Sequence, residues 1–98
     1  MAAYIVFMRE QMRDPESFGR YMEAVPPTLA GHPVRPLAIY GRMQMLEGAP
    51  LEGAVIAEFA DWDAAMAWYH SPEYTQAREL RFKAGDYRVF IIEGLPPA

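Results

Sequence analysis

The sequence predicts one small α+β domain, covering residues 1–98, whose sheet has four antiparallel strands. Four short apolar segments rich in β-branched and aromatic residues indicate strands, and longer segments with apolar residues every three or four positions indicate helices. Their order is strand, helix, strand, strand, helix, strand. This is the ferredoxin-like βαββαβ order, in which both helices lie on one face of the sheet.

The first half of the chain begins with a strand at residues 4–8, followed by a helix that starts at Asp14. Asp14 can accept hydrogen bonds from the first turn, and Pro15 suits the first helical position. We expect Pro26 and Pro27 to stop or kink this helix, because proline has no N–H to donate and disfavours a helical residue before it. Residues 36–46 then predict a second strand, bent or bulged near Gly41.

The second half repeats this pattern. A third strand is expected at residues 54–59, and Asp61 is suited to cap the helix that follows it. Ser71 and Pro72 restart a helix in the same way that Asp14 and Pro15 start the first one. The last strand is expected at residues 87–93.

The strands are apolar on both faces, which bears on the oligomeric state. In the last strand the alternating residues are apolar on either side: Val89 and Ile91, Phe90 and Ile92. Two helices cover only one face, and soluble monomers rarely expose a large apolar patch. We therefore expect a homodimer in which a second sheet covers the other face. The alternative is a monomer whose loops fold over it.

Composition excludes several classes of protein. The formal net charge is −4 and no lysine or arginine cluster occurs, so we expect neither nucleic-acid binding nor attraction to an anionic membrane. The chain has no cysteine, and its two histidines are far apart without a metal-binding spacing. We expect no metal site, no cofactor and no membrane span, and a cytoplasmic location.

Several short segments resemble a known family of small bacterial proteins. They are Asp14-Pro15-Glu16, Leu46-Glu47-Gly48, Glu58-Phe59, Trp68-Tyr69-His70-Ser71-Pro72-Glu73-Tyr74 and Ile92-Glu93-Gly94. The chain is similar to the domain of unknown function 1330 family from about Tyr4 to Gly94. The resemblance implies a dimeric α+β barrel, which agrees with the two-sided strands, and it implies no activity.

The chain also departs from that family. Members usually have Arg-Gly-Gly in the middle of the second strand, where this chain has Ile39-Tyr40-Gly41. Arg35 falls where many members carry an arginine. If the family has a site that uses both arginines, this chain has lost half of it.

Glu58, His32 and Arg35 are the candidates for catalysis. Alternation along the third strand places Glu58 beside apolar neighbours, a setting that suits a general base, although an ion pair with Arg35 or Arg42, or exposure at the strand end, is an alternative. His32 is a candidate because imidazole is the side chain suited to act as a general base near neutral pH, although a loop residue turned to solvent is the interpretation we favour.

Five aromatic residues are candidates for lining a ligand pocket between sheet and helices: Tyr21, Tyr40, Trp68, Tyr69 and Tyr74. The alternative is that they form an ordinary core. Three functions remain open. They are a cofactor-free enzyme acting on a small, partly apolar metabolite, a non-catalytic ligand-binding or sensing module, and a structural or partner-binding homodimer.

Overall fold

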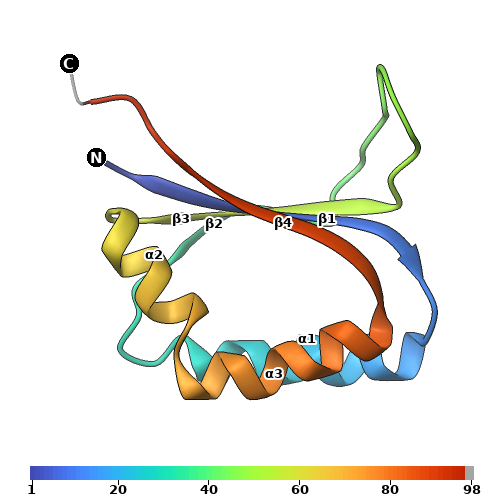
Figure 1. The fold of residues 1–98 in the computed structure, drawn as a ribbon, viewed down its shortest axis with the longest axis horizontal. Coiled ribbons are helices and arrows are strands. Elements are labelled where there is room, and N and C mark those ends of the chain that lie inside the picture. The colour runs from blue at the N-terminus through green and yellow to red at the C-terminus, as the bar shows by residue number, and fades with distance from the viewer. Residues whose placement is uncertain (97–98) are drawn as a thin grey trace.

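Four antiparallel strands form one sheet in the order β2-β3-β1-β4, and within residues 1–96, which the computed structural model describes, three helices cover one face of it (Figure 1). The elements are β1 (Ala3–Met12), α1 (Pro15–Thr28), β2 (Arg35–Ile39), β3 (Gly53–Phe59), α2 (Trp62–Tyr69), α3 (Pro72–Ala84) and β4 (Gly85–Glu93). The predicted α+β, ferredoxin-like architecture is confirmed. The predicted second helix is divided into α2 and α3.

The helices begin at the predicted caps. The side chain of Asp14 accepts a hydrogen bond from the N–H of Glu16, Asp61 accepts one from Ala64, and Ser71 accepts one from Tyr74. These bonds satisfy N–H groups that have no partner within the first turn of a helix.

Of the two outcomes expected at Pro26 and Pro27, a stop or a kink, the stop does not occur, because α1 continues through both prolines to Thr28. Its last turn is closed from beyond the prolines, where the N–H of Leu29 donates to the carbonyl oxygen of Pro26 and the N–H of Ala30 donates to that of Pro27. Each proline lacks an N–H, so the helix goes without the hydrogen bond that this residue would donate to the carbonyl four positions earlier.

The second strand is shorter than predicted. β2 ends at Ile39 instead of continuing to residue 46, because Tyr40 turns the chain with a positive φ of 49°. The irregularity in the pairing of β2 with β3 lies between Pro36 and Ala38, and not at Gly41.

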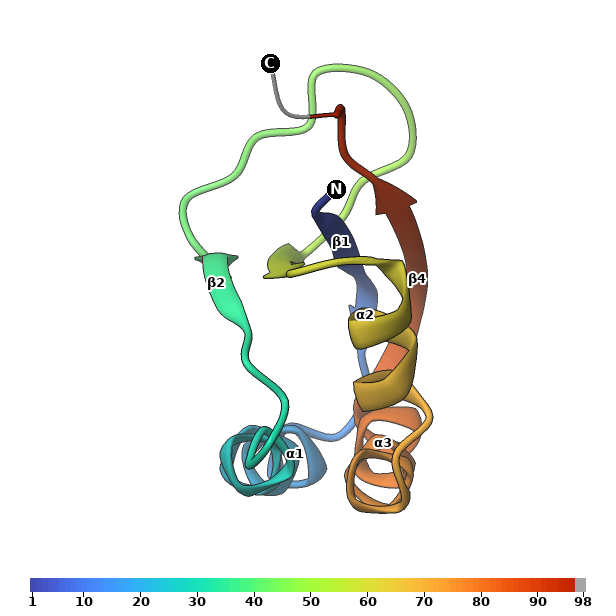
Figure 2. The same ribbon diagram turned by 90° about the vertical axis from the view of Figure 1, so that its left-hand side faces the viewer.

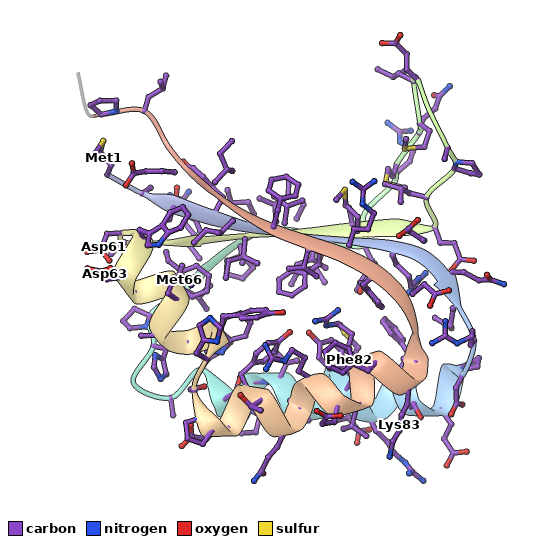
Figure 3. All side chains as sticks on the ribbon, viewed as in Figure 1. Met1, Asp61, Asp63, Met66, Phe82 and Lys83 are labelled. Carbon is purple, nitrogen blue, oxygen red and sulfur yellow. The ribbon has the colours of Figure 1, made fainter. Side chains whose placement is uncertain are left out.

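The two faces of the sheet differ in what covers them. Ile5 and Phe7 of β1 and Phe59 of β3 face the helices and are buried in the core. Phe90 and Ile92 of β4 face the other way and are about half exposed. Side chains fill the space between the sheet and the helices (Figure 3).

The helices form a layer below the sheet. Figure 2 shows α1 and α3 next to each other, with β2 on the side of α1 and β4 on the side of α3. The segment between β2 and β3 and the C-terminal segment instead rise on the opposite side of the sheet (Figure 1). Within residues 1–96 no helix is long and apolar enough to cross a membrane.

Candidate functional site

An apolar cavity of about 200 Å³ lies between α1 and the strands β1, β2 and β3. Every residue that lines it is aliphatic, aromatic or proline: Phe7, Tyr21, Met22, Val25, Pro26, Leu29, Val34, Pro36, Ile39, Tyr40, Val55, Ala57, Phe59 and Trp68. Met22 and Ile39 are 37% and 53% exposed, so the cavity opens between α1 and β2. An engineered apolar cavity of about 150 Å³ holds benzene, so this cavity has room for one ring or a short branched chain.

A second hollow, of about 370 Å³, lies between α1 and α3. Its lining includes Pro27, Glu73 and Gln76, which are exposed on the outer helical surface. It is a groove between two helices, and none of the predicted site residues lines it.

Two pairs of tyrosine hydroxyls lie near the interior cavity. The hydroxyl oxygens of Tyr21 and Tyr74 are 2.8 Å apart, and those of Tyr40 and Tyr87 are 2.7 Å apart. Tyr21 and Tyr40 line the cavity, whereas Tyr74 and Tyr87 do not. The surface of the cavity is therefore almost entirely apolar, and each hydroxyl pair is connected to it through one tyrosine ring.

The hydroxyls of Tyr21, Tyr40 and Tyr74 are neutral at physiological pH. Burial raises the pKa of Tyr21, Tyr40 and Tyr74 above the ordinary value of a phenol, and for Tyr40 the hydrogen bond with Tyr87 adds to this effect. They can donate or accept hydrogen bonds, but they supply no negative charge and no base.

A buried arginine of α3 lies beside the hydroxyl pairs. Arg81 is only 3% exposed, and its guanidinium carbon lies 5.7 Å from the ring centre of Phe7, 5.2 Å from that of Phe82 and 5.1 Å from that of Tyr87. Its Nη2 is 3.5 Å from the hydroxyl of Tyr69, and its Nε has no hydrogen-bond partner within the described chain. This guanidinium has cation–π contacts on several sides and far fewer hydrogen bonds than its five N–H groups can make.

The structure brings the five predicted aromatic residues together. Tyr21, Tyr40 and Trp68 line the cavity, and Tyr74 packs against Trp68 with the ring centres 4.0 Å apart. Tyr69 lies against the same tryptophan at 6.4 Å. The indole Nε1 of Trp68 donates to the hydroxyl of Thr28 at 3.0 Å, which fixes the indole ring against α1.

The three predicted catalytic residues lie outside this cluster. Glu58 is opposite Tyr4 and Arg35 in the sheet register, on the face that the helices do not cover. Arg35 is exposed, and no ion pair joins it to Glu58 within residues 1–96. His32 is in the loop after α1 and does not line the cavity. Glu58 points away because Ala57, its neighbour in β3, faces the cavity, and successive strand residues face opposite sides.

Sequence reasoning did not single out Arg81 or Tyr87. The signal for Arg81 was its position seven residues after Tyr74, which places both on one face of α3 together with Ala77. An arginine on the buried face of a helix is unusual enough to mark a site. In the described part of the chain no three acidic or histidine side chains lie close enough together to hold a metal ion.

Solved structures with this fold are similar over nearly the whole chain. A protein of unknown function from Rhodopseudomonas palustris has a TM-score of 0.70 and 20% identity, over 98% of this chain and 84% of that one. A dimeric ferredoxin-like protein of unknown function from Bacteroides fragilis has a TM-score of 0.64 and 14% identity, over 95% and 96%. An ethyl tert-butyl ether d (EthD) family protein from Bacillus halodurans has a TM-score of 0.64 and 15% identity, over 97% and 100%.

No curated protein matches this sequence. A family described as a domain of unknown function, DUF1330, does match it, over residues 2–95. This match covers almost the whole domain, from β1 through β4. The chain therefore belongs to the DUF1330 family, as its sequence motifs indicated.

Proposed function

We propose that this protein is a homodimer that binds a small, partly apolar molecule in the interior cavity. The observation that carries the proposal is the cavity itself, which has apolar walls and is bordered by the rings of Tyr21 and Tyr40, whose hydroxyls belong to the two hydrogen-bonded pairs. Small-molecule sites in proteins are concave, mostly apolar and equipped with a few polar groups that orient the ligand.

The residues that line the cavity favour a protein that binds its ligand without converting it over an enzyme. The residues that line the cavity include no carboxylate and no imidazole, and Tyr21 and Tyr40 are neutral hydroxyls. A general base needs to lie within hydrogen-bond distance of the proton that it removes. A cofactor-free enzyme remains the second candidate, to be tested by incubating any ligand that binds with the protein and measuring its disappearance.

The dimer is supported by the uncovered face of the sheet. Phe90 and Ile92 are 45% and 54% exposed there, and Val6 and Ile56 lie between them and the other edge of the sheet. The similar protein from Bacteroides fragilis is dimeric, as is a ferredoxin-like protein of unknown function from Thermobifida fusca. A second copy of the same sheet is the partner that matches this apolar surface.

The proposal is tested by filling the cavity. Val55 of β3 lines it, and Val55→Phe places a ring in the space that a ligand would occupy. In a thermal-shift screen of monocyclic acids, amides, alcohols and ketones, a ligand at about 100 times its Kd stabilises the wild type by about 2.7 kcal/mol, a rise in Tm of the order of 10 °C. We expect Val55→Phe to lose this rise.

The matched control is Ile91→Phe, which adds a ring on the same sheet face but beside a different hollow, next to Tyr69 and His70. Its ligand-induced rise in Tm should equal that of the wild type. A ligand that stabilises Val55→Phe as much as the wild type binds elsewhere, and a broad panel without a single hit would refute the proposal.

A further inference from the structure

Arg81 is a buried cation without a buried anion. Burying a charge is costly unless it is paired and hydrogen-bonded. The ion pairs within residues 1–96 join Arg9 to Glu52, Arg13 to Asp86 and Arg20 to Glu16. None of them involves Arg81, although it is the most deeply buried charged residue in the described chain.

Burial raises the pKa of Tyr21 and Tyr74, so their hydroxyls do not neutralise the charge of Arg81. The hydroxyl pairs add hydrogen-bond donors instead. Each pair contains two hydrogens, and the bond between its two oxygens uses one of them. The second hydrogen of each pair is available to another acceptor. The Nε of Arg81 is also without a partner within residues 1–96, so donors without an assigned acceptor lie beside the cavity.

Three aromatic residues connect these donors to the apolar cavity. Phe7 lines the cavity and lies under the guanidinium of Arg81, and Tyr21 and Tyr40 line the cavity while their hydroxyls belong to the two pairs. Arg81 itself does not line the cavity. A molecule with its apolar body in the cavity would meet Arg81 where its head extends past these rings.

We infer that the ligand is a small apolar monocarboxylate whose carboxylate pairs with Arg81 and the tyrosine hydroxyls while its hydrocarbon or aromatic body fills the cavity. The inference rests on the proposed binding function and specifies its ligand class. The planar guanidinium matches a carboxylate with two parallel hydrogen bonds, a geometry that a point charge does not provide. The cavity limits the body to about six to eight carbon atoms, by comparison with the cavity of about 150 Å³ that holds benzene.

The test compares acids with their neutral amides. Binding of benzoate and cyclohexanecarboxylate to the wild type is measured by calorimetry at pH 7.5, beside benzamide and cyclohexanecarboxamide, which have nearly the same shape. We expect each acid to bind about 10- to 100-fold more tightly than its amide, because hydrogen bonds to charged groups are stronger than neutral ones.

Substitutions then identify the residue that causes the preference for acids over amides. Arg81→Met keeps the length of the side chain and removes its charge, and we expect it to abolish the preference for acids while amide binding persists. The control is Arg78→Met on the same helix, whose guanidinium lies over Tyr69 and Phe82 (Phe82 is labelled in Figure 3). This control should keep the preference. If Arg81→Met does not fold, the comparison of acid and amide binding to the wild type still tests whether the protein prefers a carboxylate.

The outcomes separate the two proposals. If amides bind as tightly as acids, and Val55→Phe blocks both, the cavity is a binding site and the carboxylate inference is wrong. If Arg81→Met retains the preference for acids, Arg81 does not recognise the carboxylate and the inference is also wrong. If none of the four probes binds, the carboxylate inference falls, and the proposed function then depends on the rest of the panel.

Discussion

At the scale of single residues, Tyr40 connects backbone strain to the candidate site. Its φ of 49° lies in the left-handed region, where a bulky aromatic residue is rare and costs about 1–3 kcal/mol. The ring of Tyr40 lies over Gly53, and its centre is 5.4 Å from the ring centre of Phe18. The hydroxyl of Tyr40 is hydrogen-bonded to that of Tyr87. Strain of this kind persists where the surrounding contacts hold it, and here those contacts hold the ring of Tyr40 in the wall of the cavity.

Gly53 makes this position of Tyr40 possible. A Cβ atom at residue 53 would lie 2.7 Å from Cδ1 of Tyr40, so Gly53→Ala must displace the ring and break the hydroxyl pair with Tyr87. We expect a loss of about 1–3 kcal/mol in the free energy of unfolding, measured with urea, together with weaker ligand binding.

The control for this substitution is Gly41→Ala, next to Tyr40, where an added Cβ meets nothing within 4 Å. It should change stability by less than about 0.5 kcal/mol. Equal stability of the two variants would show that Tyr40 does not pack on Gly53.

Residue types indicated the aromatic members of the site, but they did not indicate where the charged residues point. Glu58 and Arg35 face the uncovered side of the sheet, whereas Arg81 of α3 lies inside. A side chain in a strand changes face with a shift of one residue, and the irregularity between Pro36 and Ala38 cannot be located from the sequence.

At the scale of elements, the junction of α3 and β4 depends on a glycine. Gly85 has an extended backbone, and its N–H donates to the carbonyl of Arg81. A Cβ there would lie 2.2 Å from the backbone oxygen of Gln11 and 3.0 Å from Cα of Met12. These are backbone atoms of the paired strand β1, so they cannot move aside as a side chain can. Glycine is required at this position because the two strands approach closely, and not because the backbone adopts an angle that only glycine tolerates.

We therefore expect Gly85→Ala to lower the free energy of unfolding by about 3 kcal/mol, at the upper end of the cost of overpacking. Gly19→Ala provides the opposite comparison, since Gly19 is exposed in α1 and an added Cβ meets nothing within 4 Å. It should raise stability by about 0.5–1 kcal/mol, because alanine is the better helix former. Urea unfolding of both variants checks this, and an unchanged midpoint for Gly85→Ala would contradict the close approach.

At the scale of the whole molecule, the sheet is covered on one side only. Figure 1 shows all three helices below it, while above it the segment between β2 and β3 and the C-terminal segment rise at opposite ends. The sheet carries apolar residues on this open side, including Phe90 and Ile92 of the edge strand β4. A dimer formed through this face would bury these residues without changing the cavity on the other side of the sheet.

Phe90→Asp places a charge on that face, and we expect it to convert the dimer into a monomer, because burying an unpaired carboxylate is costly. Size-exclusion chromatography with light scattering measures the change as a halving of the mass. Met22→Asp, at a similarly exposed position on the helical side, should remain dimeric. A wild-type protein that is monomeric at micromolar concentrations would rule out the dimer.

The sequence by itself determined the α+β class, the order of the strands and helices, and the starts of all three helices, because caps, prolines and apolar periodicity are local signals. It also indicated that both faces of the sheet are apolar. Only the tertiary structure decided that Tyr40 ends β2, that α1 continues through its two prolines, and that Arg81 is buried against Tyr69 and Tyr87. These features depend on strand register and on the packing of α3 under the sheet, which bring together residues far apart in the sequence and leave no local pattern.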